Sequence, residues 1–376
     1  MVHRLRGTYA EIHLPHLAEN YRTLRSLLPS ENFFCPMIKA NAYGHGDKEV
    51  ALVLQDAGAE HVGVVLVEEG IRLREAGISM GILVFGTFDS AAAQEFVRYD
   101  LTPVISSWQS LKIFEESLES DAYLRVHLKF NTGMNRLGFE VEDAKRLAQH
   151  MSEQSRFQVV GLCTHLLNGE DAGIADGYSS KQQERFLMVQ KEFSDPKIQI
   201  HYLNSSALLM NVDSTSGARP GISMYGIYPP THKKPSVLLK PVMSFHSHIA
   251  LLHQVKKGEV VSYGAKWKAE RDSMIGLVPV GYADGYPRSL TNRGQMLVRG
   301  KRVPVTGIVC MDYTMVNLTD LHLQKPIELN EEVVLFGKQL GQTLSVQELA
   351  DLAGTIPYEI VTRLGARVSK SFIYEH

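Results

Sequence analysis

The feature of this sequence that most constrains its fold is an alternation of short β-rich runs with amphipathic stretches, which begins near residue 32. Stretches such as 47–59 and 179–193 separate the β-rich runs and have the pattern of helices. Alternating strands and helices are typical of βα units around a parallel sheet. The candidate strands span residues 32–39, 61–65, 81–86, 101–106, 122–130, 157–165, 198–204 and 214–220. They predict an α/β protein built on a (β/α)8 TIM barrel.

The sequence changes character at a cluster of proline and lysine from Pro229 to Pro241, which predicts a linker or an exposed loop. Later runs alternate apolar and polar residues with a period of two, and they predict a mainly antiparallel β domain. These runs are 244–255, 274–283, 295–309 and 331–337. A chain of 376 residues exceeds an ordinary single domain. We therefore expect a barrel over residues 12–235 and a β domain over 236–376, which residues 1–11 join as a strand.

Composition and charge limit the classes of molecule that this protein is expected to bind. The formal net charge is −2 and no long block of one charge occurs, so neither nucleic acid nor a membrane surface is expected. The basic amino terminus lacks the apolar core of a secretory signal, which predicts a cytoplasmic protein. Three distant cysteines, Cys35, Cys163 and Cys310, fit neither a disulfide framework nor a zinc spacing. Small molecules are the expected ligands, and no metal is expected.

Polar residues gather at the predicted carboxyl ends of the barrel strands, where the active sites of such barrels lie. Lys39, Lys129, His165, Asn204 and Arg219 end the first, fifth, sixth, seventh and eighth candidate strands. Each of them alone is explained as a polar residue at a strand end. Together they predict a basic mouth that suits an anionic ligand and an amine placed for covalent chemistry with a carbonyl group.

A phosphate pocket is expected beside this mouth. The stretch from Asn204 through Ser205 and Ser206 lies at a strand-to-helix turn, where hydroxyl and N–H groups bind phosphate. Gly221 and Ile222 offer further N–H groups after the eighth strand, and barrels commonly bind phosphate in these last loops. Ser205 can also be a simple helix N-cap. A phosphate pocket and a reactive lysine together point to pyridoxal 5′-phosphate.

Seven motifs, taken in order and spacing, resemble those of the alanine racemase family of fold-type III pyridoxal-phosphate enzymes. They are "KANAYGHG", "NTGMNRLGF", "RPGISMYG", "SYGAKW", "GYADGYPR", "CMD" and "TIPYEIVTRLGARV". The resemblance covers essentially the whole chain. It implies a racemase that interconverts L- and D-alanine, supplies D-alanine for peptidoglycan, and works as a homodimer with shared active sites.

The resemblance also implies roles for individual residues. Lys39 would hold the cofactor covalently and act as one of two catalytic bases, and Tyr263 of the partner subunit would be the second base. Arg219 would face the pyridine nitrogen of the cofactor, and His165 would link Tyr263 to Arg219. Arg136 would contact the phenolic oxygen of the cofactor and the carboxylate of the substrate.

Further roles implied by the resemblance concern the phosphate and the substrate pocket. Lys129 resembles a lysine that is carbamylated in some members of the family. Two features depart from the family: Asn131 replaces an acidic residue, and the loop 166–180 is unlike the common form. The implied phosphate ligands are Tyr43, Ser205, Gly221, Ile222 and Tyr358, and Met311 and Tyr282 are the implied residues of the substrate pocket and its entrance.

Four alternatives remain open. A racemase of broader specificity, for serine or other amino acids, fits the same motifs. A fold-type III decarboxylase usually places an acidic residue against the pyridine nitrogen, so Arg219 argues against it. A single-barrel carrier of pyridoxal phosphate lacks the β domain. An aldolase-type barrel would use its lysine without a cofactor, and a cofactor absorbance band would exclude it.

Overall fold

The computed structural model of the chain describes residues 6–210, 215–229 and 237–375. The described residues divide into two compact units. The barrel unit comprises those of His16–Ala42 and Gly46–Lys240, and the β unit comprises those of Met1–Pro15, Tyr43–His45 and Pro241–His376. The boundary predicted between residues 235 and 236 lies outside the described residues.

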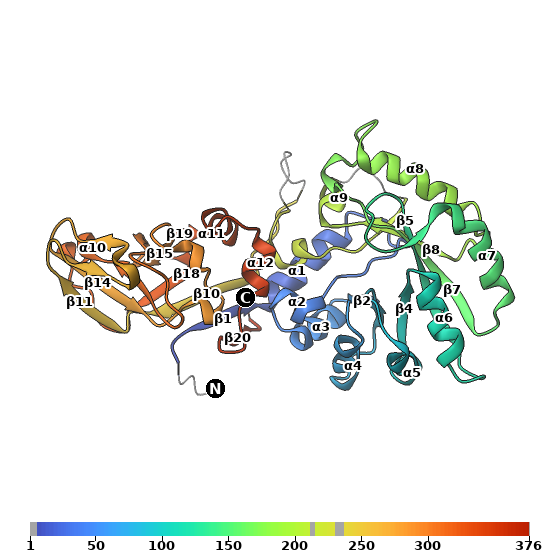
Figure 1. The fold of residues 1–376 in the computed structure, drawn as a ribbon, viewed down its shortest axis with the longest axis horizontal. Helices are drawn as coiled ribbons and strands as arrows, with labels where there is room; N and C mark the ends of the chain where they lie inside the picture. Colours follow the sequence, from blue (N-terminus) through green and yellow to red (C-terminus); the bar gives the residue numbers. More distant parts are fainter. Residues whose placement is uncertain (1–5, 211–214, 230–236, 376) are drawn as a thin grey trace. The chain divides into compact units, whose positions relative to one another are not determined.

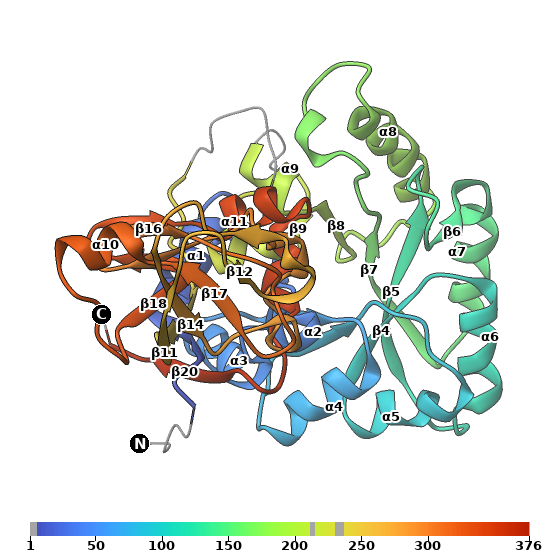
Figure 2. The ribbon, with the colours of Figure 1, turned by 60° about the vertical axis from the view of Figure 1, so that its left-hand side comes forward.

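A parallel sheet forms the centre of the barrel unit, and Figure 2 shows helices α4 to α8 outside its strands. β6 (Phe139–Glu140) pairs with β5 at the end of that strand. Parallel sheets are covered on both faces, which explains the near-continuous apolar runs of the sequence. In hydrogen-bonding order the strands are β2 (His61–Val64), β3 (Gly81–Val84), β4 (Leu101–Ile105), β5 (Leu124–Asn131), β7 (Phe157–Cys163), β8 (Gln199–Leu203) and β9 (Gly217–Ala218).

The segment 33–38 joins the two edges of this sheet. Phe34 forms a parallel bridge with Ala218 of β9, and Met37 forms one with Gly63 of β2. The predicted first strand is therefore present as a bridged segment rather than a continuous strand. One reason is Pro36, which has no N–H to donate to a ladder. The (β/α)8 TIM barrel predicted from the sequence is confirmed.

Helices connect and cover the barrel strands (Figures 1 and 2). A cluster of buried side chains from different strands fills the barrel interior: Phe33, Cys35, Leu83, Val104 and Cys163. The helices are α1 (Leu14–Arg25), α3 (Asp47–Asp56), α4 (Val67–Glu75), α5 (Ala93–Arg98), α6 (Trp108–Ser117), α7 (Ala144–Glu153), α8 (Tyr178–Gln190) and α9 (Ser205–Met210), with the short turn α2 (Lys39–Tyr43) after the bridged segment.

The β unit is mainly antiparallel, as predicted, and its largest sheet includes the amino-terminal strand β1 (Tyr9–His13). One pair departs from the pattern, because β20 (Ser369–Ile373) runs parallel to β1. The remaining strands of this sheet are β10 (Met243–His248), β15 (Gln295–Val298), β16 (Lys301–Pro304), β18 (Glu332–Gln339) and β19 (Gln342–Leu344).

Two smaller sheets and three short α-helices also belong to the described part of the β unit. The sequence did not predict these helices, because each spans only 6 to 8 residues, too few for a helical period to stand out. In the described residues, no helix is long and apolar enough to cross a membrane. The smaller sheets contain β11 (Leu251–Val255), β14 (Ser273–Val278) and β17 (Thr314–Asn317), and β12 (Val260–Val261) with β13 (Trp267–Lys268); the helices are α10 (Thr319–Gln324), α11 (Val346–Ala353) and α12 (Pro357–Thr362).

Candidate active site

Lys39 begins a turn with an unusual backbone. It directly follows the bridged segment, whose last residue, Ile38, donates its N–H to the carbonyl oxygen of Gly63 at 2.8 Å. The next four residues, 40–43, all have positive φ angles between 52° and 55°. A left-handed conformation costs a non-glycine residue roughly 1–2 kcal/mol. Surrounding contacts must therefore hold this turn, and backbone strain of this kind concentrates at functional sites.

Asparagine and glycine residues shape the end of the turn. The carbonyl oxygen of Asn41 accepts the N–H of Gly46 at 3.0 Å, and its side-chain Oδ1 accepts the N–H of Asp47, the first residue of α3, at 2.9 Å. Gly44 has φ of +82°, and a Cβ atom there would lie 2.1 Å from the carbonyl oxygen of Val361. No other residue type fits at Gly44.

A buried carboxylate, Glu69 of α4, also lies against the turn. Its Oε1 accepts the N–H of Ala40 at 2.6 Å, and its Oε2 accepts the N–H groups of Val65 and Leu66 at 2.9 and 3.1 Å. Glu69 was not among the residues predicted from the sequence, because its reach to the neighbour of Lys39 depends on the fold.

The basic mouth predicted from the strand ends is present in the barrel unit. Lys129 on β5 pairs in register with Cys163, the last residue of β7, so Lys129 lies level with the carboxyl end of β7, and β5 continues to Asn131 rather than ending at Lys129 as predicted. Burial, and then the charge of Arg136, lowers the pKa of Lys39. Burial lowers the pKa of Lys129 to about 8, and the charges of Arg219, Arg136 and Lys39 contribute to this shift. Amines with lowered pKa values are neutral more often near physiological pH, and neutral amines act as bases and nucleophiles.

Arg219 is buried and binds the ends of two neighbouring strands. Its Nη2 donates to the carbonyl oxygen of Thr164 at 2.6 Å and lies 3.4 Å from Nδ1 of His165. Burial, followed by the charges of Arg219 and Lys129, holds the pKa of His165 well below its usual range, so this imidazole is neutral. A guanidinium only donates hydrogen bonds. His165 therefore accepts at Nδ1 and carries its proton on Nε2.

Arg219 also begins a series of hydrogen bonds that runs through two further imidazoles, those of His201 and His127. Arg219 Nη1 lies 2.7 Å from Nδ1 of His201, and Nε2 of His201 lies 2.7 Å from Nδ1 of His127. Because Arg219 is the donor, the proton of His201 sits on Nε2 and is donated to His127, whose own proton sits on Nε2. Burial lowers the pKa of His127 to about 3. Neither histidine was among the residues predicted for the site, although both lie within predicted strands.

The predicted phosphate pocket is rich in hydrogen-bond donors. The hydroxyl oxygen of Ser205 accepts the N–H of Gly221 at 2.9 Å and both the N–H and the hydroxyl of Ser223 at 3.4 and 3.0 Å. Ile222 begins a one-turn 3₁₀ helix, so its N–H has no acceptor within that helix. Several donors thus share one hydroxyl acceptor. A phosphate group would supply the acceptor oxygens that this pocket lacks, so the residues fit the cofactor expected from the sequence.

Asn204 lies between this pocket and the loop 166–180. Its Oδ1 accepts the N–H of Ala207 at 3.0 Å, which caps α9, and its Nδ2 donates to the carbonyl oxygen of Leu166 at 3.3 Å. Asn204 therefore positions the turn that carries Ser205.

The two tyrosines assigned to the phosphate by resemblance lie near each other in the β unit. The ring centroids of Tyr43 and Tyr358 are 6.3 Å apart. Burial raises the pKa of both, that of Tyr358 to about 12. Both phenols therefore keep their protons at neutral pH and can donate hydrogen bonds to an anion.

Of the remaining predicted residues, Arg136 is an exposed residue of the barrel unit, and Tyr263, Tyr282 and Met311 lie near one another in the β unit. The Ser262 hydroxyl, next to Tyr263, donates to the carbonyl oxygen of Ile308 at 2.8 Å. The N–H of Tyr282 donates to the carbonyl oxygen of Cys310, the neighbour of Met311, at 3.0 Å. The side chains of Tyr263, Met311 and Tyr282 are 73%, 52% and 43% exposed within this chain. We call Tyr263, Tyr282 and Met311 the β-domain edge.

Asn131, the first departure from the family, stabilises a turn. Its Oδ1 accepts the N–H groups of Gly133 and Asn135 at 3.3 and 2.9 Å. Its Nδ2 donates to Oε1 of Glu140 at 3.2 Å and to Oδ1 of Asn135 at 3.1 Å. The side-chain amide of Asn131 thus donates hydrogen bonds that an ionised acidic side chain could not donate.

The loop 166–180, the second departure, is tied to the mouth through Gln182 of α8. The Gln182 amide donates to the carbonyl oxygen of His165 at 3.0 Å and to the Thr132 hydroxyl at 3.1 Å. Its Oε1 accepts the N–H of Leu167 at 2.7 Å. Gln182, which was not among the residues predicted for the site, thus fixes the start of this loop beside His165.

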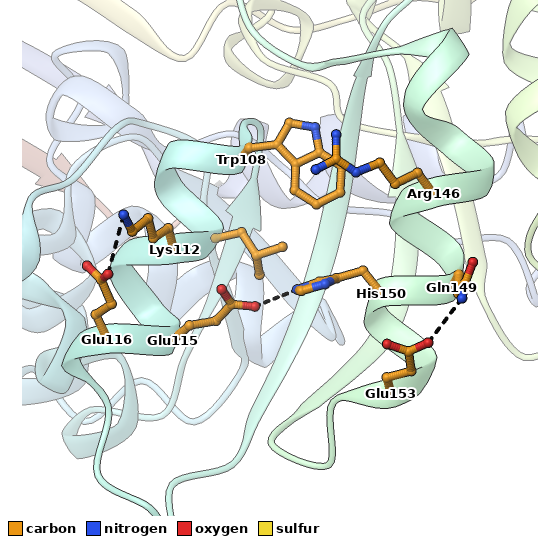
Figure 3. Close-up of a pocket in the computed structure, with 9 residues that line it drawn as sticks. Trp108, Lys112, Glu115, Glu116, Arg146, Gln149, His150 and Glu153 are labelled. Carbon is orange, nitrogen blue, oxygen red and sulfur yellow. Dashed lines mark hydrogen bonds and ion pairs between the residues drawn. The ribbon is translucent and has the colours of Figure 1, made fainter.

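Two hollows of the barrel unit lie away from the mouth. One, of about 570 Å³, lies on the outside between α6 and α7, where Lys112 and Glu116 form an exposed ion pair (Figure 3). The other, of about 410 Å³, is lined by His61 and His127 and by residues at the amino ends of the strands. Neither is lined by a lysine that ends a predicted strand.

Together the described residues define a class of protein. A barrel mouth with two lysines of lowered pKa, one buried and one half-buried, and a donor-rich pocket after the last strands suits an enzyme that attaches a phosphorylated carbonyl compound to an amine. The family follows from comparison with known proteins. Models of the alanine racemase N-terminal and C-terminal domains match residues 12–229 and 242–372. The chain belongs to the alanine racemase family.

Individual relatives support this membership. The chain is 35% identical to the alanine racemase of Halothermothrix orenii, over 98% of this chain and 97% of that protein. It is also 35% identical to the alanine racemase of Carboxydothermus hydrogenoformans, over 98% of this chain and 100% of the relative.

Solved structures agree. Alanine racemase from E. faecalis matches with a TM-score of 0.92 and 32% identity, over 99% of this chain and all of that chain. Alanine racemase from Bartonella henselae, solved with covalently bound pyridoxal phosphate, matches with a TM-score of 0.87 and 27% identity, over 98% and 99% of the two chains.

Proposed function

We propose that this chain is a pyridoxal-phosphate-dependent racemase that interconverts L- and D-alanine with two bases, Lys39 and Tyr263 of the partner subunit. The observation that carries the proposal is the half-buried Lys39 amine at a basic mouth, where Lys129 and Arg219 are buried and the exposed Arg136 adds its charge. The donor-rich pocket around Ser205 supports the choice of cofactor. A cytoplasmic location belongs to the same proposal, and so does the supply of D-alanine for peptidoglycan, which rests on the resemblance.

Pyridoxal phosphate, when bound, links to the amino group of the substrate and makes the proton on Cα removable. Lys39 accepts or returns that proton on one face, because burial and Arg136 favour its neutral amine. Tyr263 of the partner subunit does the same on the opposite face. Arg136 binds the substrate carboxylate, which orients Cα between the two bases.

The surroundings of the cofactor follow from the residues that would hold it. Ser205, Gly221, Ile222, Tyr43 and Tyr358 would hold the phosphate through N–H and hydroxyl donors. Arg219 would face the pyridine nitrogen and, because a guanidinium does not readily give up a proton, would leave that nitrogen unprotonated. Arg219 would thereby weaken electron withdrawal by the ring and favour prompt return of the proton over side reactions.

The dimer is part of the proposal. Tyr263 and Met311 are more than half exposed within this chain, although their proposed roles require a site that excludes water. A second copy whose barrel mouth covers the β-domain edge would bury them. Each active site would then combine the mouth of one subunit with the β-domain edge of the other.

Covalent trapping tests the proposed function. Protein incubated with pyridoxal phosphate and reduced with borohydride should carry the label on Lys39 and should convert L-alanine to D-alanine before reduction. Lys39→Ala should lose both the label and the activity. Lys48→Ala, which removes an exposed lysine from α3, is the matched control and should retain both. A label on another lysine of the wild-type protein would reject the assignment.

Substrate breadth is a separate question that the loop 166–180 raises. Because Gln182 ties the start of this loop to the carbonyl oxygen of His165, the loop lies beside the mouth. Rates measured for alanine, serine and larger amino acids would decide between an alanine racemase and a racemase of broader specificity. We expect alanine to be the best substrate.

A further inference from the structure

The role of Glu69 begins with the way α4 starts. The residue before the helix is Leu66, whose side chain cannot accept a hydrogen bond, so the usual side-chain cap is missing. Glu69, the third residue of the helix, reaches back, and its Oε2 accepts the N–H groups of Leu66 and Val65 at 3.1 and 2.9 Å. One carboxylate oxygen thus fixes the junction between β2 and α4.

The other oxygen of the same carboxylate serves a different element. Glu69 Oε1 accepts the N–H of Ala40 at 2.6 Å. Ala40 is the first left-handed residue of the strained turn and the immediate neighbour of Lys39. The turn's own backbone bond runs from the N–H of Ala42 to the carbonyl oxygen of Ile38, so it leaves the Ala40 N–H without an acceptor inside the turn. Glu69 supplies that acceptor.

The environment makes these hydrogen bonds strong. Glu69 is only 6% exposed, and hydrogen bonds to an ionised group away from water are shorter and stronger than neutral ones. A charge this close also acts on the amine: the Glu69 carboxylate raises the pKa of Lys39, against burial and Arg136, which lower it. Glu69 therefore affects both the position of the Lys39 amine and its protonation.

We propose that Glu69 is a positioning residue that holds the Lys39 amine in place by tying the first left-handed residue, Ala40, to the carboxyl end of β2. This inference rests on the proposed function, because it assigns Glu69 a part in the attachment of the cofactor to Lys39. Glu69 itself contacts backbone N–H groups, so its effect reaches the chemistry only through Lys39.

The test compares Glu69→Gln with Glu68→Gln, its matched control. The amide introduced by Glu69→Gln keeps one acceptor oxygen but replaces the other with a donor, so the Ala40 N–H and the β2–α4 junction can no longer both be satisfied. Glu68 is the preceding residue of the same helix, is exposed, and loses the same charge on substitution. Three quantities are measured on the full chain: hydrogen exchange of the peptides 38–44 and 65–70, the rate at which added pyridoxal phosphate is trapped on Lys39, and kcat and KM for L-alanine.

If Glu69 positions Lys39, Glu69→Gln exchanges the Ala40 amide faster and attaches the cofactor about 10- to 100-fold more slowly. Its kcat falls by a similar factor while KM changes by less than about twofold, and Glu68→Gln matches the wild type. Normal attachment and kcat in Glu69→Gln, with faster exchange confined to residues 65–70, would reduce Glu69 to a helix cap and overturn the inference.

Two further outcomes keep the test decisive. If Glu69→Gln does not fold, the wild type alone is informative, because the Ala40 amide must be protected from exchange; an unprotected amide overturns the inference. If the wild type attaches no cofactor to Lys39, the proposed function fails, and this inference fails with it. That result is distinct from failure of the inference alone, in which the wild type and Glu69→Gln attach the cofactor equally.

Discussion

The barrel mouth and the β-domain edge carry the two proposed bases in opposite surroundings. At the mouth, Lys129 and Arg219 are 7% and 6% exposed, and burial together with the charges of Arg219, Arg136 and Lys39 lowers the pKa of Lys129. At the β-domain edge, Tyr263 and Met311 are 73% and 52% exposed. The mouth is thus organised within one chain, whereas the β-domain edge presents its side chains to whatever binds there.

This difference in burial indicates what each region would contribute to a shared active site. Burial and neighbouring cations lower the pKa values of the mouth lysines without any partner. No comparable burial acts on Tyr263 in the single chain. The proposed dimer therefore has unequal contributions: one subunit brings an organised mouth, and the other completes it with a tyrosine and a methionine.

The largest expected effect separates the two bases. Tyr263→Phe should bind the cofactor with the wild-type absorption spectrum, because the mouth is untouched, but should racemise alanine about 10²- to 10⁴-fold more slowly. In deuterated water, Lys39 should still exchange the α-proton of one enantiomer, which the resemblance predicts to be the D form. NMR of each enantiomer measures this exchange. Equal exchange from both enantiomers would mean that one base serves both faces.

A smaller expected effect concerns the free energy of unfolding, which the burial of the charged Lys129 at the mouth lowers. The pKa of Lys129 is lowered to about 8 in the folded chain, from an ordinary value of 10.5. Below pH 8 both the folded and the unfolded chain bind the proton, and the folded chain carries the full cost of burying it. Between pH 8 and 10.5 the unfolded chain binds more protons, so stability rises with pH by about 3 kcal/mol from this residue.

The variant Lys129→Met tests whether the contribution of Lys129 to stability rises with pH in this range. Its advantage in the free energy of unfolding over the wild type should be largest below pH 8 and should shrink toward pH 10.5, as measured by denaturant titration in CO₂-free buffer. Lys145→Met, which removes an exposed lysine from α7, is the control for charge alone. An advantage of Lys129→Met that stays constant over this pH range would contradict the account of the mouth.

The smallest effect concerns Asn131, next to the mouth. Asn131→Asp keeps the acceptor for Gly133 and Asn135 but replaces the hydrogen bond to Glu140 with a repulsion between two carboxylates. We expect a loss of about 1 kcal/mol in stability near neutral pH, seen as a lower midpoint in urea. Adding Glu140→Gln should recover most of it. No change in Asn131→Asp would show that the bond to Glu140 contributes nothing measurable.

The sequence predicted the barrel well, because its strands and helices differ strongly in period and the apolar runs of parallel strands are easy to recognise. It also predicted that Lys39, Lys129, His165 and Arg219 end strands, and position alone then selects the mouth. The short helices of the β unit were missed. The roles of the individual site residues stay predictions.

The sequence could not indicate contacts between residues that are far apart in the chain and that only the fold brings together. The hydrogen bond from Ala40 to Glu69 joins residues 29 positions apart, and no local pattern marks it. The left-handed backbone of residues 40–43 is equally hidden, since alanine and tyrosine rarely adopt it. His201 looked like an ordinary strand residue until the fold placed it against Arg219.

The central claim is that one active site combines the mouth of one chain with the β-domain edge of another. Mixing inactive Lys39→Ala and Tyr263→Phe proteins tests it, because a hybrid dimer has one site with both substitutions and one with neither. With free subunit exchange, about half of the dimers are hybrid, so activity should return to about a quarter of the wild-type value. Mixtures that stay inactive, although native mass spectrometry shows hybrid dimers, would contradict the claim.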